Sequence, residues 1–217
     1  MSANLSISDC RFCAIVAGTP ASRLDSPWLS GEAYVALASL GAIIPGWSLV
    51  VPRSHCLNLD GHVHSADFNE FLKKAVNRVQ EKYGPVAIFE HGSTAHDSVT
   101  SCGTSHAHMH LVPVDFNLVE VAKDFDRERT WYPCALSEIA SVAQGREYLY
   151  MANTYSGAQT PGWISPLKVS CSQFFRKVIS AHVGEGQLYD YKVYPRIEAS
   201  LETARALSSD PKAECSA

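Results

Sequence analysis

The apolar residues in the first half of the chain follow two patterns, short runs typical of strands and one long repeat typical of a helix. Residues 67–83 carry apolar side chains at helical spacing, with Ser65 or Asp67 available as the N-cap and Gly84-Pro85 as the stop. Strands are predicted at residues 32–37, 47–51 and 86–90. This order of elements predicts an α+β fold, in which a long helix packs on an antiparallel sheet.

The second half of the chain differs from the first in composition, and its residue pattern predicts an α+β extension. Its predicted elements are helices near residues 136–143, 172–182 and 198–207 and a strand at residues 147–151. Trp131-Tyr132-Pro133 is interpreted as a break, and residues 157–166, rich in Gly and Pro, as a loop. No internal repeat is convincing. We therefore predict a first domain at residues 1–115 and a C-terminal extension at residues 116–217.

Three histidines stand at two-residue spacing in a short apolar stretch, His106, His108 and His110. Side chains alternate along a strand, so these imidazoles would share one face of it. Such a row fits a metal site, a coincidental polar strand or a phosphotransfer centre. Neutral imidazole is a nucleophile and imidazolium is a donor to an oxyanion. The preceding loop is rich in Gly, Ser and Thr, whose backbone N–H groups can bind an anion, and this favours phosphate.

Composition narrows the classes of protein that this chain fits. A formal net charge of −4 without a basic block argues against a dedicated nucleic-acid binder. No apolar run is long enough to span a membrane, and the first six residues lack the regions of a signal peptide, which favours a cytoplasmic protein. Seven cysteines, an odd number, do not resemble a disulfide framework. Cys10 and Cys13 form a C-x-x-C pair, which is either a buried reduced pair or a pair of ligands to one metal ion.

The histidine run, followed by apolar residues, resembles the signature of the histidine-triad (HIT) nucleotide hydrolases and transferases. Three other segments are similar to that family in order and spacing. They are the Cys-x-Phe-Cys segment at residues 9–18, the hairpin at residues 45–55 and the strand at residues 89–92. The resemblance covers residues 9 to 115 and implies a HIT-like fold for the first domain.

The resemblance also implies a mechanism and a set of site residues. His108 would attack the α-phosphorus of a nucleotide-like small molecule, and His110 would donate to the phosphate or the leaving group. Backbone N–H groups near Gly103, Thr104 and Ser105 would stabilise charge on the phosphate oxygens. Cys10, Cys13, His55 and His106 would hold a structural Zn²⁺. Domains of this family commonly pair their sheets across a two-fold axis, so we expect a homodimer, and the extension would either widen that interface or cover the sheet within one chain.

Some positions differ from the family pattern. Ser39 stands where familiar members carry an Asp or Asn that binds the ribose hydroxyls, so a nonstandard nucleotide or another phosphate ester becomes a candidate substrate. Arg176, in the predicted helix near residues 172–182, would face a phosphate, although a capped amphipathic helix explains that segment equally well. His91 and His96 flank the loop before the triad, where exposed histidines are the simpler interpretation and substrate contact is the alternative. The second functional hypothesis is a nucleotide-binding or zinc-stabilised regulatory module with a vestigial triad.

Overall fold

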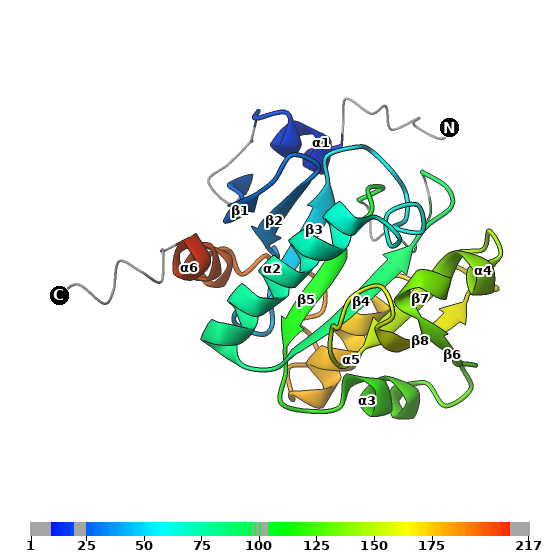
Figure 1. The fold of residues 1–217 in the computed structure, drawn as a ribbon. Helices are drawn as coiled ribbons and strands as arrows, with labels where there is room; N and C mark the ends of the chain where they lie inside the picture. The colour runs from blue at the N-terminus through cyan, green and yellow to red at the C-terminus, as the bar shows by residue number, and fades with distance from the viewer. Residues whose placement is uncertain (1–9, 20–24, 97, 99, 101–103, 209–217) are drawn as a thin grey trace, which may run out of the picture.

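One antiparallel sheet of eight strands forms the centre of the protein, with helices on both faces (Figure 1). The computed structural model describes residues 10–19, 25–96, 98, 100 and 104–208. The strands, in the spatial order β1-β2-β3-β5-β4-β7-β8-β6, are β1 Leu29–Ser30, β2 Tyr34–Ala38, β3 Ser48–Pro52, β5 Met109–Pro113, β4 Val86–Gly92, β7 Tyr148–Ala152, β8 Pro161–Pro166 and β6 Tyr132–Ala135. The helices are α1 Arg11–Val16, α2 Ala66–Tyr83, α3 Leu118–Phe125, the 3-10 turn η4 Leu136–Glu138, α4 Ile139–Ala143, α5 Phe174–His182 and α6 Ile197–Ser208. The predicted α+β class is confirmed.

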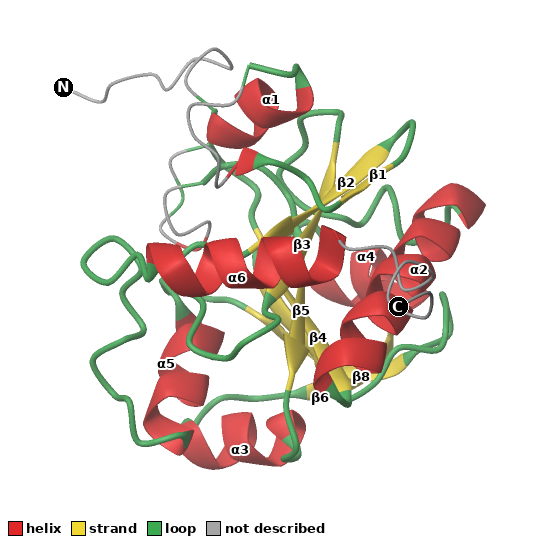
Figure 2. Ribbon diagram, turned by 90° about the vertical axis from the view of Figure 1, so that its left-hand side faces the viewer, coloured by secondary structure: helices red, strands yellow, loops and turns green. Residues whose placement is uncertain are grey.

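The long helix α2 forms where its apolar spacing predicts. Ser65 is its N-cap and accepts a hydrogen bond from the Phe68 N–H at 3.4 Å, and Gly84 ends the helix with φ of 92°. Its buried face, which includes Phe68, Leu72 and Val79, packs on β2, β3, β4 and β5. This contact covers the sheet face opposite to the one on which α3 and α5 lie (Figure 2).

Two strands of the second half were not predicted. The expected break at residues 131–133 includes the start of β6, and the expected loop at residues 157–166 contains β8. Tertiary pairing overrides the local signal at both places. Pro133 lies in β6, which pairs only with β8, and a proline is tolerated in an edge strand because no neighbour requires its missing N–H. The helix α3 was also missed.

The second half repeats the topology of the first half. β3-α2-β4-β5-α3 and β6-α4-β7-β8-α5 have the same order and the same antiparallel neighbours. The pairing registers of the two halves agree when each residue of the first is matched with the residue at the same place in the second: Val50 with Cys134, Ile88 with Tyr150, and Leu111 with Ile164. All six side chains belong to one buried cluster. The antiparallel pair of Phe89 and Met151 lies at the centre of this two-fold relation. The sequence shows no convincing repeat, so the similarity is one of topology.

The extension covers one edge of the first half of the sheet. β7 pairs with β4 along five residues, from Ile88 opposite Ala152 to Gly92 opposite Tyr148. Of the two arrangements expected for the extension, the structure therefore has the one in which it covers the sheet within one chain. The boundary between residues 115 and 116 stays a prediction, because one continuous sheet joins the two parts. Within the described residues, no helix is long and apolar enough to cross a membrane.

The segment between α5 and α6 is fastened to the turn after β2. The Gly41 N–H donates to the Pro195 carbonyl at 2.7 Å, and the Ser200 hydroxyl donates to the Ser39 carbonyl at 2.8 Å. Arg176, which is buried in α5, donates from Nε to the Tyr189 carbonyl at 2.8 Å and from its terminal nitrogen to the Gly41 carbonyl. Residues far apart in the chain are thus held together beside β2.

Arg176→Met tests this fastening. The substitution leaves the Gly41 and Tyr189 carbonyls without their charged donor, and we expect the free energy of unfolding to fall by about 2–4 kcal/mol. Lys177→Met is the matched control, because the only contact described for the Lys177 side chain is with the Tyr189 ring, whose centroid lies 5.4 Å from Nζ. This control substitution should lower the free energy of unfolding by less than about 1 kcal/mol. Urea unfolding followed by fluorescence measures both values, and equal losses would contradict the assignment.

Glu90 is a fully buried carboxyl group on the α2 side of the sheet. It accepts hydrogen bonds from the Leu59 N–H and the Tyr148 hydroxyl, both at 2.7 Å. Burial raises the pKa of Glu90 to about 8, although these two donors lower it in part. Because the folded pKa lies above the unfolded value, stability contributed by this group is present at low pH and is lost as pH rises toward about 8.

Glu90→Gln should therefore remove part of the pH dependence of stability. Between pH about 5 and about 8 the wild type should lose up to about 1.4 kcal/mol per pH unit from this carboxyl group, and the variant should lose none of it. The difference in unfolding free energy between the two proteins, measured in urea at several pH values, should favour the variant increasingly as pH rises. The exposed Glu81→Gln is the control, and parallel curves for wild type and Glu90→Gln would refute the prediction.

Candidate functional site

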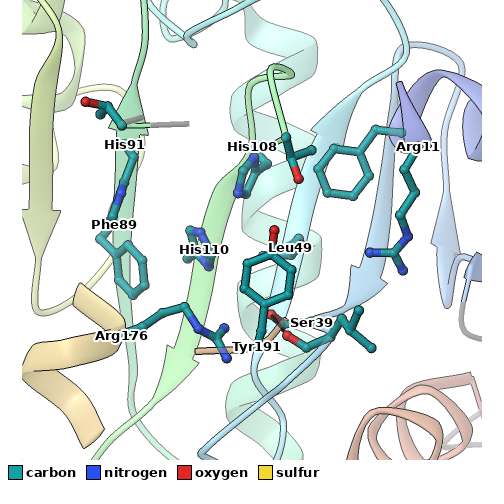
Figure 3. A pocket seen from close by; sticks show the side chains of 13 residues that line it. Arg11, Ser39, Leu49, Phe89, His91, His108, His110, Arg176 and Tyr191 are labelled. Atoms are coloured by element: carbon teal, nitrogen blue, oxygen red, sulfur yellow. Dashed lines mark hydrogen bonds between the residues drawn. The ribbon is translucent and has the colours of Figure 1, made fainter. Parts of the chain in front are cut away.

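The three histidines lie on the segment that enters β5, and the rings of His108 and His110 lie on one side of it (Figure 3). The assigned strand begins at Met109, so His106 and His108 belong to the segment before it rather than to the strand itself. Ala107, Met109 and Leu111 are buried in the cluster that includes α2. The predicted alternation is therefore present, and it separates an apolar face from a face that carries the imidazoles.

His106 is the least exposed of the three and has a partner near each ring nitrogen. Its Nε2 is 2.9 Å from the Pro52 carbonyl, which only accepts, so this nitrogen carries the proton. Its Nδ1 then carries the lone pair and faces the thiols of Cys10 at 3.4 Å and Cys13 at 3.6 Å. Burial lowers the pKa of His106 to about 4, so the ring is neutral at pH 7. A neutral imidazole with its other N–H bonded to a carbonyl is the form in which histidine binds metals.

Four side chains meet at this point in an arrangement that suits a metal ion. One ligand atom from each of Cys10, Cys13, His55 and His106 lies within 4.8 Å of the others, and the His55 Nδ1 is 3.1 Å from the Cys13 Sγ. Two thiols and two imidazoles are the donor set of a tetrahedral Zn²⁺ site. The short helix α1 brings the cysteines there, because Cys10 is its N-cap and Phe12 packs against the strands β2 and β3.

His108 is the imidazole with a free lone pair toward the pocket. Its Nδ1 is 2.8 Å from the backbone carbonyl of His106, so Nδ1 donates and Nε2 carries the lone pair. The edge of the Phe12 ring contacts its ring, with centroids 5.4 Å apart. Burial lowers the pKa of His108, which favours the neutral form. The residue next to the candidate metal centre is therefore a neutral imidazole whose Nε2 lone pair is not used in the Nδ1 hydrogen bond.

His110 is held against two aromatic side chains. The Phe89 ring stacks on it, with centroids 4.3 Å apart and an angle of 17° between the planes. The Trp47 Nε1 lies 2.9 Å from its Nδ1. Burial, together with repulsion from His108, His91 and Arg176, lowers the pKa of His110 well below its ordinary value.

A pocket with a cavity of about 60 Å³ opens beside His108 and His110. The lining residues come from α1, β3, β4, β5 and α5, and from the loops, including the one that follows β2 (Figure 3). They are Arg11, Phe12, Ser39, Leu40, Leu49, Phe89, His91, Thr100, Thr104, His108, His110, Arg176 and Tyr191.

Of the residues predicted to bind substrate, Ser39, Thr104 and Arg176 line this pocket. The Ser105 hydroxyl instead donates to the His96 carbonyl. Gly103 lies outside the described residues. The structure thus brings three of these five positions to the candidate nucleophile.

Several lining residues were not predicted from the sequence. Arg11 is fixed by hydrogen bonds of 2.9 and 2.6 Å to the buried Asp25, and Tyr191 comes from the segment between α5 and α6. His91 is in β4 and half-buried in the pocket wall, so the simpler interpretation of it as an exposed loop residue is wrong. The position of Phe12 inside the Cys-x-Phe-Cys segment was a usable signal, whereas nothing local indicates Tyr191.

No protein-family model and no curated protein matches the chain. Similar solved structures include a HIT family hydrolase from Clostridium thermocellum, which is 22% identical, covers 52% of this chain and 96% of its own, and has a TM-score of 0.40. A HIT family protein from Bacillus anthracis is 18% identical over 50% of this chain and 74% of its own, with a TM-score of 0.39. A zinc-bound histidine triad family protein from Mycobacterium smegmatis is 21% identical over 49% of this chain and 75% of its own, with a TM-score of 0.38. These three similar structures carry the name of the histidine-triad family.

Proposed function

We propose that the protein is a nucleotide hydrolase or nucleotidyltransferase that works through a covalent intermediate on His108. The observation that carries this proposal is the 2.8 Å hydrogen bond from the His108 Nδ1 to the His106 carbonyl, which leaves the Nε2 lone pair at the pocket. A nucleophile held in one tautomer needs no further reorganisation before it attacks. The resemblance of the sequence motifs to the histidine-triad family supports the same chemistry.

The proposed reaction has two displacements at the α-phosphorus of a phosphoanhydride, phosphoramidate or phosphate ester. In the first, the His108 Nε2 bonds to phosphorus and the bond to the leaving group breaks, with the electron pair going to the leaving group. In the second, water or another acceptor bonds to phosphorus and gives up its proton to the leaving group or to solvent, while the N–P bond breaks with its electron pair returning to Nε2, which restores neutral His108. His110 donates to the phosphate or to the leaving group.

Charged and polar groups around the pocket fit an anionic substrate. Arg11 and Arg176 place two guanidinium groups on its wall, and Ser39 and Thr104 add hydroxyl groups. We expect Ser39, a shorter partner than a carboxylate, to bind a sugar hydroxyl weakly. Backbone N–H groups near Gly103, Thr104 and Ser105 stay a prediction as the oxyanion site. The panel of labelled nucleotides in the experiment below tests which nucleotide-like compound is the substrate.

We also propose that Cys10, Cys13, His55 and His106 bind a structural Zn²⁺. All four donors come from the protein, so the ion would have no open position for substrate. It would supply cross-links between α1, the segment after β3 and the histidine segment. These are the elements that position Phe12 and His108 at the pocket.

The homodimer expected from the sequence stays a prediction. The β4 edge is paired with β7 of the same chain, so a second copy would have to bind at another surface. The cytoplasmic location is likewise still a prediction.

His108→Ala tests the activity. We expect the wild type, incubated with a panel of labelled nucleotides, to form an acid-labile adduct on the protein, and the variant to form none, because the attacking nitrogen is lost. Turnover should fall by at least about a thousandfold. His64→Ala, an exposed histidine, is the control. No adduct and no turnover in the wild type, together with retained nucleotide binding, would favour the alternative, a binding or regulatory module with a vestigial triad.

Cys10→Ser tests the metal site. The wild type should contain about one equivalent of zinc by elemental analysis, and the variant should lose most of it, because a serine hydroxyl is a poor zinc ligand. Thermal unfolding should move to a lower temperature in parallel. Cys171→Ser, outside the cluster, should keep the metal. Unchanged zinc content in Cys10→Ser would exclude this ligand.

A further inference from the structure

Trp47 is completely buried between the Pro45-Gly46 turn and the wall of the pocket. Its backbone is held in place, because its carbonyl accepts a hydrogen bond from the Ser39 N–H at 2.9 Å. The edge of its indole meets the Phe89 ring, with centroids 5.8 Å apart, and the guanidinium carbon of Arg176 lies 4.9 Å from the ring centroid. These contacts hold the indole in one orientation.

The indole N–H of Trp47 points at His110. The distance from its Nε1 to the His110 Nδ1 is 2.9 Å, which is an ordinary hydrogen bond, and both groups are buried. An indole nitrogen donates and cannot accept. The His110 nitrogen that faces it must therefore provide a lone pair.

A neutral imidazole carries one proton on its two nitrogens. The side of His110 that faces Trp47 is the acceptor side, so the proton is on Nε2. A side chain able both to donate and to accept at position 47 would permit either tautomer. Tryptophan permits one, and the alternative would place two N–H groups against each other in a buried site.

We propose that Trp47 is a positioning residue, which holds His110 as the Nε2–H tautomer so that this ring presents a hydrogen-bond donor to the pocket. His108 is held in the opposite tautomer by the His106 carbonyl. Two neighbouring imidazoles, with ring centroids 4.7 Å apart, thus present a lone pair and an N–H group respectively. This inference rests on the proposed function and deepens it, because it names the residue that makes His110 a donor.

The tautomer can be measured without any substrate. In protein labelled with ¹⁵N at histidine and tryptophan, long-range ¹H–¹⁵N correlation spectra distinguish the protonated ring nitrogen from the unprotonated one, and His110→Gln assigns the signals. We expect the wild type to show His110 protonated at Nε2. In Trp47→Phe, which keeps an aromatic ring but removes the N–H, the ratio of Nε2–H to Nδ1–H tautomer should fall about five- to tenfold.

Trp131→Phe is the matched control. Trp131 is partly buried and packs against the cluster that contains Trp47, and its buried indole nitrogen has no hydrogen-bond partner among the described residues. The His110 signals should be the same in this variant as in the wild type. A wild-type His110 protonated at Nδ1, or an unchanged tautomer ratio in folded Trp47→Phe, would overturn the proposal.

A second measurement uses only the wild-type protein, so it tests the proposal even where Trp47→Phe does not fold. A scalar coupling through the hydrogen bond should connect the Trp47 Nε1 with the His110 Nδ1 in the wild-type protein, and its absence would also overturn the proposal. Neither spectrum depends on turnover, so a failure of this proposal can be distinguished from a failure of the proposed function, which the His108 adduct tests. Where the wild type forms that adduct, Trp47→Phe should form it about five- to tenfold more slowly, and Trp131→Phe at the wild-type rate.

Discussion

The site depends on His106, because this one residue is bonded through its ring and through its backbone at the same time. Its Nε2–H donates to the Pro52 carbonyl at the end of β3, and its Nδ1 faces the thiols on α1. Its carbonyl accepts the Nδ1–H of His108. A buried polar network is stable only when each member has its partner. The candidate metal centre and the candidate nucleophile are therefore coupled, since moving His106 would disturb both.

The roles of the three histidines follow from their partners and not from their residue type. A carbonyl and two thiols surround His106, a carbonyl orients His108, and an indole orients His110. Burial lowers the pKa of all three rings, so each is a neutral imidazole that both donates and accepts. Three chemically identical side chains in one short segment can thus provide a metal ligand, a nucleophile and a hydrogen-bond donor.

The second half of the chain repeats the topology of the first half but has no histidines on the strand that corresponds to β5. It nevertheless contributes residues to the candidate site. In the register that relates the two units, Trp163 of β8 occupies the place of His110 in β5. The second unit instead pairs with the edge of β4 and supplies α5. Arg176 of this helix lines the pocket, and the Phe175 ring packs against the Phe89 ring, with centroids 4.4 Å apart. The edge of β4 is thereby paired with β7 instead of being left open, and α5 adds a residue to the wall of the pocket.

The sequence by itself determined the features that have a local or motif-level cause. The apolar spacing and Ser65 predict α2, the alternation separates the imidazoles from the apolar face, and the motif resemblance names the four residues that meet as a candidate metal centre. Only the tertiary structure decided the rest. β6 and β8 form because partner strands override local Gly and Pro signals, and β7 covers β4 because the registers of distant strands match. The bond from Trp47 to His110 joins residues 63 positions apart, and such a contact is set by the register of β3 on β5, which no local pattern encodes.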